Sequence, residues 1–303
     1  MRPKLNVKIG KLNLKNPVMA ASGTFGYGTE FEGLADIGRL GAVVTKTITL
    51  RERSGNKPPR IMETSSGMLN SIGLENPGVE RFIEEKLPPL KKYGIPVIVS
   101  IAAENIAEYG ELARRLDKVK DVAAIEINIS CPNLGTDRLF SQDEASTGDV
   151  VKAVRAATHK TVITKLSPNV TDIASIAQSA ESAGSDALSL INTVTAMAVD
   201  IDKKESRLGS VTGGLSGPAI KPVALFMVWA VYQKVRIPLI GTGGIMDWKD
   251  AVEFMLCGST AVSVGTANFV EPDSAAGIVE GLKAYLEKEK IEDIRGITGI
   301  LKT

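Results

Sequence analysis

The sequence predicts an α/β protein built as a single (β/α)8 TIM barrel. Eight short segments rich in valine, isoleucine and alanine recur along the chain, and helical patterns separate most of them. These segments lack clean alternation, as expected of strands that are covered on both faces. The length of 303 residues suits one such barrel, which typically needs about 250 residues. A doubly wound sheet would show the same alternation and is the alternative fold.

A short hairpin is expected before the barrel, because residues 5–14 alternate apolar and polar side chains around Gly10 and Lys11. The eight barrel strands are expected where apolar, β-branched segments end at glycine, proline or polar residues. They are PVMAAS (17–22), AVVTKTIT (42–49), VIVSIA (97–102), AIEINIS (124–130), VITKLSP (162–168), ALSLINT (187–193), PLIGTGG (238–244) and AVSVGTA (261–267).

Helical patterns fill most of the intervals between these strands. Apolar residues recur on one helical face at residues 106–116, 173–180 and 278–285. Pro218 stands where a first-turn proline belongs, which predicts a helix from there to about residue 234.

Three long segments without periodicity follow predicted strands, at residues 50–80, 132–147 and 194–217. Each connects a strand to the next helix, and such connections lie on the C-terminal face of a barrel, where barrel enzymes keep their chemistry. We therefore expect long functional loops on that face. No internal repeat or linker interrupts the pattern, so residues 1–303 are expected to form one domain.

The composition argues against several kinds of protein. The 36 basic and 35 acidic residues give a net charge of +1 without a long basic run, so neither nucleic acid nor a membrane surface is an expected partner. No segment approaches the ~20 apolar residues of a membrane span. Cys131 and Cys257 are far apart, so we expect a cytoplasmic protein without disulfides. With His159, which is expected at the surface, they cannot supply the four ligands of an iron–sulfur cluster, and no metal site is predicted.

Cys131 stands where a predicted strand becomes a loop. The strand at 124–130 cannot continue through Pro132, which has no N–H for a sheet ladder. Asn128 and Asn133 place amides on either side of the thiol. Composition alone favours a Cys131 thiol that packs as a small apolar side chain, whereas the neighbouring amides favour a reactive thiol. The second cysteine, Cys257, lies near a helix end in FMLCGS and is expected to pack in the core.

Two lysines lie inside apolar strand segments, Lys46 in VVTKTIT and Lys165 in VITKLSP. Taking an ammonium out of water costs several kcal/mol unless it is paired or near the wet end of the strand. One interpretation is a structural ion pair with a carboxylate such as Glu126. The interpretation that we favour is a site for an anion or an electron-rich ring, because both lysines occur late in their strands.

Glycines end the seventh and eighth predicted strands. Gly-Thr-Gly-Gly at 241–244 and the pair Gly265 and Thr266 would let backbone N–H groups approach a ligand, and barrels commonly bind phosphate at these two connections. Neither this motif nor GTFGYG at 23–28 completes a dinucleotide fingerprint. Amide side chains in or beside the same face suit a small planar ligand with carbonyl, N–H and carboxylate groups, although loop capping by asparagine is common. They are Asn70, Asn128, Asn133 and Asn192.

In combination and order, these motifs resemble the class 1 dihydroorotate dehydrogenases. They are INISCPN, the NSIGLENPG loop, Lys46-Thr47, Lys165, Ile191-Asn192-Thr193, GGLSGPAIKP and IGTGG followed by VGTA. The GGLSGPAIKP stretch looks most like the 1B catalytic subunit, and Cys131 stands where class 2 enzymes carry serine. The resemblance spans essentially the whole chain. It implies a flavin mononucleotide (FMN) barrel that oxidises (S)-dihydroorotate to orotate in pyrimidine biosynthesis.

The resemblance also implies roles for individual residues. Cys131 would be the base that removes the proton from C5 of the substrate while hydride leaves C6 for the flavin. Lys165 would offset negative charge on the reduced flavin ring. The residues implied in FMN binding are Ser22, Lys46, Thr47, Ser100, Asn128, Lys165, Ile191, Gly217, Gly243, Gly244, Gly265 and Thr266. The residues implied in substrate binding are Lys46, Asn70, Ile72, Gly73, Leu74, Asn128, Asn133, Asn192 and Thr193.

A 1B-type chain implies NAD as oxidant, reached through a partner subunit that carries FAD and a [2Fe–2S] cluster. The implied assembly is a heterotetramer with two copies of each subunit around a homodimer of this chain. Trp229 and Phe226 are candidate interface anchors, although packing of their helix against the barrel explains them equally well. Alternatives within the resemblance are a 1A-like homodimer using fumarate and a dihydropyrimidine dehydrogenase-like reductase. Two alternatives lie outside the resemblance. One is a non-catalytic flavoprotein, and the other is a non-redox barrel in which Lys165 is a Schiff-base lysine that acts on a sugar phosphate.

Overall fold

The computed structural model of the chain describes residues 3–130 and 140–302. Eight parallel strands close into a barrel in the order β10-β15-β16-β3-β4-β7-β8-β9. The closed barrel confirms the predicted (β/α)8 fold and excludes the doubly wound alternative. The barrel strands are β3 (Val18–Ala20), β4 (Ala42–Val44), β7 (Val97–Ile101), β8 (Ala124–Asn128), β9 (Thr161–Leu166), β10 (Ala187–Leu190), β15 (Leu239–Thr242) and β16 (Ala261–Val264).

All eight strands fall at their predicted positions, but each ends earlier than predicted. The segment predicted at 42–49 leaves the continuous ladder after Val44, where the N–H of Lys46 donates to the carbonyl of Gly26 at 2.8 Å, and Ile48 then forms an isolated bridge with Ile101 of β7. The apolar and β-branched composition nevertheless continues to Thr49, which is buried. Sequence composition reports burial, so it could not show where the hydrogen-bonded ladder stops.

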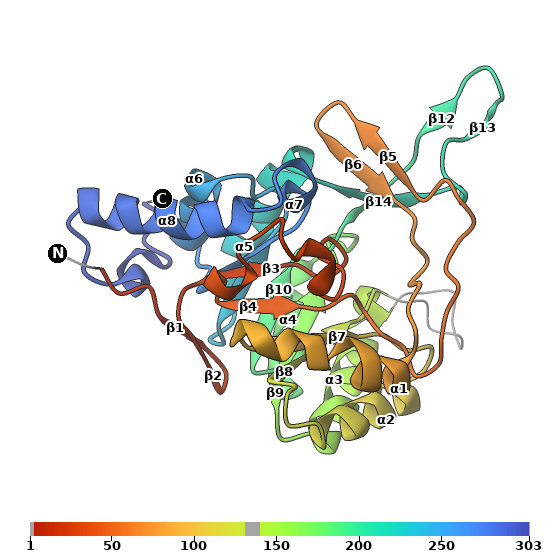
Figure 1. Cartoon of the computed structure of the whole chain (residues 1–303), viewed down its shortest axis with the longest axis horizontal. Helices are drawn as coiled ribbons and strands as arrows, with labels where there is room; N and C mark the ends of the chain where they lie inside the picture. The colour runs from red at the N-terminus through yellow and green to blue at the C-terminus, as the bar shows by residue number, and fades with distance from the viewer. Residues whose placement is uncertain (1–2, 131–139, 303) are drawn as a thin grey trace.

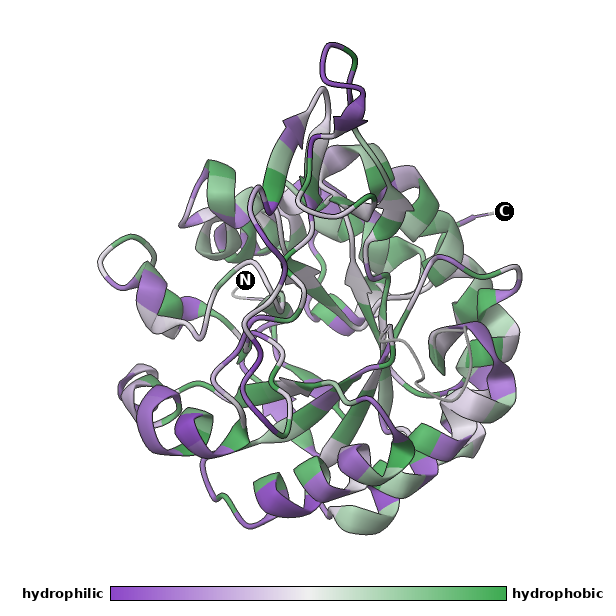
Figure 2. Cartoon of the chain, turned by 90° about the vertical axis from the view of Figure 1, so that its right-hand side faces the viewer, coloured by the Kyte–Doolittle hydropathy of each residue, from purple (hydrophilic) through white to green (hydrophobic). Residues whose placement is uncertain are grey.

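Helices surround the barrel (Figures 1 and 2). They are α1 (Val79–Arg81), α2 (Ile106–Asp117), α3 (Glu144–Ala157), α4 (Ile173–Ser182), α5 (Lys221–Tyr232), α6 (Trp248–Leu256), α7 (Ala267–Val270) and α8 (Ser274–Lys288). Shorter turns are the 3-10 segments Thr29–Phe31, Ile37–Arg39, Pro88–Tyr93, Phe140–Gln142, Pro218–Ile220 and Ile294–Ile297 and the π segment Phe82–Lys86.

The four predicted helical segments are helical in the structure, with one difference at the start of α5. Pro218 opens a 3-10 turn, and the α-helix begins only at Lys221. The turn follows Gly217, whose φ of 93° is accessible to glycine at little cost. This irregular start places Gly217 and Lys221 beside the connection after β15, which matters for the site below.

The predicted N-terminal hairpin is present as β1 (Val7–Ile9) and β2 (Leu12–Leu14), which pair antiparallel. At its turn the N–H of Lys11 donates to Oγ1 of Thr161 at 2.9 Å, where β9 begins. The hairpin therefore lies at the N-terminal end of the barrel, opposite the face on which chemistry is expected.

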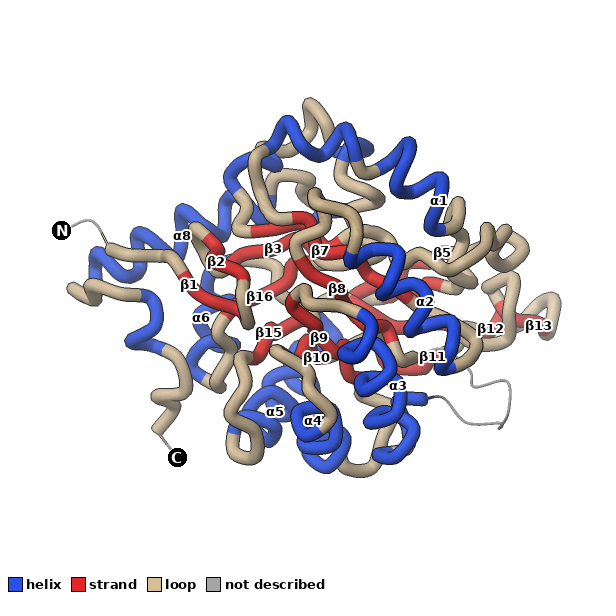
Figure 3. The backbone as a smooth tube through the Cα atoms, turned by 90° about the horizontal axis from the view of Figure 1, so that it is seen from below, coloured by secondary structure: helices blue, strands red, loops and turns tan. Residues whose placement is uncertain are grey.

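The long connections after β4 and β10 are structured, so the expectation of irregular loops is wrong for them. They contribute a four-stranded antiparallel sheet with the order β11-β14-β6-β5, which projects from one end of the barrel (Figures 1 and 3). Its strands are β5 (Ile61–Thr64), β6 (Gly67–Asn70), β11 (Val194–Ala196) and β14 (Gly213–Ser216), and β12 (Val199–Asp200) and β13 (Glu205–Ser206) form a further hairpin. The third predicted loop, 132–147, is described only from residue 140.

None of the helices in residues 3–130 and 140–302 is long and apolar enough to cross a membrane.

Candidate active site at the barrel mouth

The strand register shows which side chains line the inside of the barrel. Residues matched across parallel strands point to the same face, as do residues two apart along one strand. The register matches Ser100 with Glu126 between β7 and β8, and Asn128 with Lys165 between β8 and β9. It also matches Lys165 with Ser189 on β10. These five polar side chains therefore share the inner face, because the opposite face of the strands packs against the helices.

Lys165 is buried, with 7% of its surface exposed, and makes no hydrogen bond or salt bridge to any described residue. The alternative prediction, an ion pair with Glu126, is therefore wrong. Glu126 is also buried, and its Oε1 atom has no hydrogen-bond partner in the described part of the chain. An unpaired buried ammonium is costly. Its place near the carboxyl end of β9 favours a bound anion or electron-rich ring in the mouth.

A chain of hydroxyl groups joins three neighbouring strand ends at the mouth. Oγ of Ser22 lies 3.2 Å from Oγ1 of Thr47, which lies 2.9 Å from Oγ of Ser100. The structure thus brings together three residues that the resemblance implies in FMN binding. Lys46 precedes Thr47, and its Nζ lies 3.9 Å from Oε2 of Glu75, so this cation is only loosely paired.

Amide side chains meet at the ends of β8 and β10. Nδ2 of Asn192 donates to Oδ1 of Asn128 at 3.2 Å and to Oγ of Ser130 at 2.9 Å. Oδ1 of Asn192 accepts the N–H of Thr193 at 2.9 Å. Sequence reasoning did not single out Ser130. Its hydroxyl fixes Asn192 at the last described residue before Cys131.

The loop after β6 and the connection after β10 converge at β14. Nδ2 of Asn70 donates to the carbonyl of Gly214 at 3.2 Å. A Cβ atom added to Gly214 would lie 2.1 Å from Oγ1 of Thr193, so glycine lets Asn70 and Thr193 approach each other. Further along the loop, Gly73 and Leu74 both adopt positive φ, at 73° and 57°. The predicted substrate residues 70–74 therefore lie in one sharply folded loop beside Thr193.

Asn76, which sequence reasoning missed, holds this loop in shape. It is buried, and its side chain accepts from the N–H groups of Thr49 at 3.1 Å and Gly78 at 2.8 Å. It donates to Oγ1 of Thr49 and to the carbonyl of Leu74, both at 2.8 Å. The pair Asn76 and Pro77 is a turn signal that could have pointed to it.

Backbone N–H groups at the ends of β15 and β16 form what we call the glycine cradle, which comprises Gly243, Gly244, Gly265 and Thr266. No described residue accepts a hydrogen bond from any of these four N–H groups. Gly243 and Gly244 have φ of 126° and 76°, a region that favours glycine. Unpaired N–H groups in such an arrangement suit an anion such as phosphate. The cradle therefore fits the phosphate of the FMN that the sequence led us to expect.

Gly217 packs beside the glycine cradle, close to Thr266. A Cβ atom there would lie 2.8 Å from Cα of Gly67 and 3.5 Å from Cγ2 of Thr266, so the chain segments pack closely. Oγ1 of Thr266 donates to Oγ of Ser216 at 2.8 Å. Ile191 is buried after β10, and its N–H donates to the carbonyl of Thr242 at 2.8 Å.

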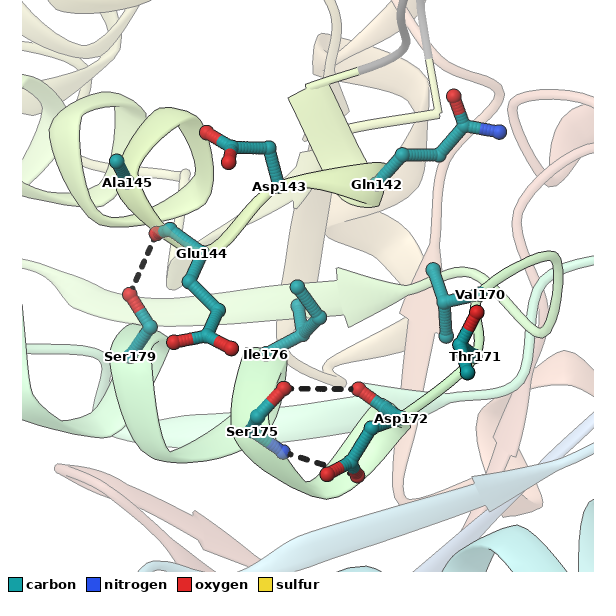
Figure 4. A pocket seen from close by; sticks show the side chains of 10 residues that line it. All are labelled: Gln142, Asp143, Glu144, Ala145, Val170, Thr171, Asp172, Ser175, Ile176 and Ser179. Carbon is teal, nitrogen blue, oxygen red and sulfur yellow. Dashed lines mark hydrogen bonds between the residues drawn. The ribbon is translucent and has the colours of Figure 1, made fainter.

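A separate cleft of about 690 Å³ lies between the starts of α3 and α4 (Figure 4). Its acidic side chains serve the local helices: Asp143 accepts from Ser146 N at 2.7 Å, and Asp172 accepts from Ala174 N at 2.9 Å. None of the predicted site residues in the described part of the chain lines this cleft. The cleft is therefore not the site that the sequence predicted.

Cys257 and His159 lie where the sequence predicted them. Cys257 packs against the apolar core, and burial, together with the nearby Glu253 carboxylate, raises the pKa of its thiol, which leaves less reactive thiolate. The His159 side chain is 96% exposed. No group of three or more potential metal ligands occurs within residues 3–130 and 140–302. Two predicted site residues, Cys131 and Asn133, lie outside the described residues.

The closed barrel, with charged and polar groups collected at the carboxyl ends of its strands, has the architecture of a (β/α)8-barrel enzyme. The family model for dihydroorotate dehydrogenase matches residues 4–286, and the chain belongs to that family. This confirms the resemblance recognised from the motifs.

Curated relatives match over nearly their whole length. The chain is 52% identical to dihydroorotate dehydrogenase B (NAD(+)), catalytic subunit, of Geotalea uraniireducens, covering 100% of this chain and 99% of the relative. It is 53% identical to the protein of that name from Trichlorobacter lovleyi, covering 100% of both chains. The corresponding protein of Desulforudis audaxviator is 53% identical, with 99% of this chain and 98% of the relative covered.

Proposed function

We propose that the chain is the catalytic subunit of a 1B-type dihydroorotate dehydrogenase, oxidising (S)-dihydroorotate to orotate in pyrimidine biosynthesis. The main support is the full-length similarity to relatives that carry this name. The mouth geometry adds independent support, because it combines a buried Lys165 with a cradle of N–H groups, and neither has a partner among residues 3–130 and 140–302. A Schiff-base sugar-phosphate barrel would explain these two features, but it would not explain the family match.

FMN, bound within one barrel domain formed by residues 1–303, would accept the hydride. The glycine cradle and Gly217 would hold its phosphate. Ser22, Thr47, Ser100 and Ile191 would surround its ring system. Lys165 would lie against the part of the ring that gains negative charge, where an ammonium is favourable.

Dihydroorotate carries a carboxylate, ring N–H groups and carbonyls, which match the amides and the cation gathered at the mouth. Lys46, Asn70, Asn128, Asn133, Asn192 and Thr193 would bind these groups, with the backbone of residues 72–74. Cys131 would remove the C5 proton, and its thiolate is the form that can act as base. Accepting that proton would convert the thiolate to a neutral thiol, which would lose the proton to water and so regenerate the base after each turnover.

The electrons would leave through a partner subunit that carries FAD and a [2Fe–2S] cluster and reduces NAD, in a heterotetramer built around a homodimer of this chain. The names of the relatives include both NAD(+) and a catalytic subunit, which supports a separate electron-transfer subunit. Phe226 on α5 is 63% exposed, and its ring centroid lies 6.4 Å from that of Trp229. An aromatic pair in which Phe226 is exposed and Trp229 is half-buried suits an interface anchor.

The test is to purify this chain alone and supply dihydroorotate with a dye, with NAD or with fumarate. We expect dye reduction and orotate formation without NADH, and NADH only after the partner is added. NADH formation by the lone chain at a comparable rate would contradict the need for a partner. Fumarate reduction would favour the 1A-like alternative, and loss of activity after borohydride treatment with substrate would favour the Schiff-base barrel.

A further inference from the structure

Three charged side chains meet behind the glycine cradle, and none belongs to the predicted site. Nζ of Lys221, the first residue of α5, lies 2.5 Å from Oδ1 of Asp250 and 2.9 Å from Oε2 of Glu253. The Asp250 side chain is 13% exposed, whereas that of Glu253 is 46% exposed. Asp250 is therefore the inner and better desolvated partner of the lysine.

The second oxygen of Asp250 binds the loop that follows the cradle glycines. Its Oδ2 accepts from the N–H of Met246 at 2.8 Å and from that of Asp247 at 3.3 Å. These residues come directly after Gly244 and Ile245. One carboxylate thus joins the start of α5 to the loop after β15, so the two segments cannot separate without breaking a charge-assisted contact.

The same two segments touch at the cradle itself. A Cβ atom on Gly244 would lie 2.8 Å from the carbonyl oxygen of Gly217 and 2.9 Å from the backbone nitrogen of Lys221. The backbone that presents the Gly244 N–H is therefore packed directly on the start of α5. Any movement between α5 and this loop would change the direction in which that N–H points.

We propose that Asp250 is a positioning residue that holds the glycine cradle in the geometry of a bound phosphate, with Lys221 as its counter-charge rather than as a phosphate ligand. This inference rests on the proposed function, since it concerns the phosphate of FMN. The ammonium of Lys221 faces two carboxylates, and its hydrogen bond with Asp250 raises the pKa of the lysine, which keeps it charged. The phosphate would then be held by neutral N–H groups whose direction is set from behind.

The test compares FMN with riboflavin, which has the same ring system but no phosphate. Apoprotein is prepared from wild type and from Asp250→Asn, and both ligands are titrated by quenching of flavin fluorescence. Asp250→Asn keeps an acceptor oxygen but loses the charge that binds Lys221. We expect FMN affinity to fall about tenfold, which corresponds to about 1.4 kcal/mol. We expect riboflavin affinity to change less than about twofold, because riboflavin has no phosphate for the cradle to bind.

Asp186→Asn is a matched control at the other end of the barrel. Asp186 also joins a basic side chain to a backbone N–H, accepting from Arg155 Nη1 at 2.9 Å and from Val162 N at 2.8 Å. A general loss of stability would lower the melting temperature of both variants and weaken both ligands alike. We expect the ratio of FMN to riboflavin affinity to change only in Asp250→Asn.

The outcomes separate this inference from the proposed function. Wild-type apoprotein that binds FMN no more tightly than riboflavin would contradict the cradle and with it the proposed function. A wild-type preference for FMN that Asp250→Asn leaves unchanged would contradict the positioning role alone. Equal weakening of both ligands would show that Asp250 only stabilises the fold.

If Asp250→Asn fails to fold, Lys221→Met gives a second test. It keeps the aliphatic stem and removes the counter-charge, which leaves two carboxylates near an anionic ligand. We expect a selective loss of FMN affinity that is smaller at high salt, because screening weakens repulsion between charges. A wild-type FMN affinity that falls with added salt, beside a variant affinity that salt leaves unchanged, would indicate that Lys221 attracts the phosphate directly and would overturn the proposal.

Discussion

Lys165 is the residue whose environment is hardest to explain without a ligand. Its ammonium lies inside the barrel beside Asn128 and Ser189, and no described carboxylate pairs with it. Sequence reasoning favoured a site over an ion pair because the lysine comes late in its strand. The same reasoning named a carboxylate such as Glu126 as the possible ion-pair partner. Register alone could not show that the two side chains make no contact.

The first prediction at this scale concerns Cys131. Replacing it by serine exchanges a thiol of pKa ~8.5 for a far weaker acid, so much less of the basic form exists near neutral pH. We expect FMN and orotate binding to persist, while flavin reduction by dihydroorotate slows by roughly 10²-fold or more, and by less at high pH. Stopped-flow reduction of Cys131→Ser at the wild-type rate would show that the thiol is not the base.

The second residue-scale prediction concerns Gly244. Valine there would place Cβ 2.8 Å from the carbonyl of Gly217, at a φ of 76° that disfavours a branched side chain. We expect Gly244→Val to purify without bound flavin, as measured by the ratio of visible to ultraviolet absorbance. Gly277→Val is the control, because a Cβ atom on Gly277 meets nothing within 4 Å. Full flavin content in Gly244→Val would contradict the assignment of the cradle.

At the scale of elements, the buried side chain of Asn76 holds the second half of the loop from Asn70 to Gly78. Asn76 makes four hydrogen bonds within the loop and to Thr49. Asn76→Ala would leave buried N–H and carbonyl groups unpaired, which costs about 1–3 kcal/mol for each group that water cannot reach. We expect the variant to lose stability toward urea and to show a raised KM for dihydroorotate.

Asn105→Ala provides the control for that variant. Asn105 caps α2 by accepting from Glu108 N at 3.0 Å, and loss of such a cap typically costs about 1 kcal/mol. We expect this control to lower stability without raising KM. A normal KM in Asn76→Ala would show that the loop does not position the substrate.

The antiparallel sheet was the largest part of the fold that sequence patterns missed. β6 and β14 pair over three residues each, and they come from connections that are far apart in sequence. Their sequences, GMLN and GGLS, are short and contain glycine, so neither shows the alternation of a half-buried strand. Such strands are stabilised by pairing with each other, and the local composition of one segment does not reveal its partner.

For the whole molecule, the rhythm of eight apolar segments was enough to predict the closed barrel, since buried parallel strands leave a strong local signal. The glycines after β15 and β16 could be predicted as a phosphate site because the fold brings these two ends together. The role of Asp250 could not be predicted, because it depends on contact with Lys221, which lies 29 residues away along the chain. Contacts of that kind emerge only once the segments have been packed.

The most direct measurement of the central claim is an anaerobic titration of the purified chain with dihydroorotate. The oxidised protein should be yellow, with FMN released on denaturation. Substrate should bleach the flavin and yield orotate in equal molar amount to the FMN reduced, because each flavin accepts the one hydride that each substrate gives up. A colourless chain, or a flavin that dihydroorotate fails to bleach, would contradict the proposed function.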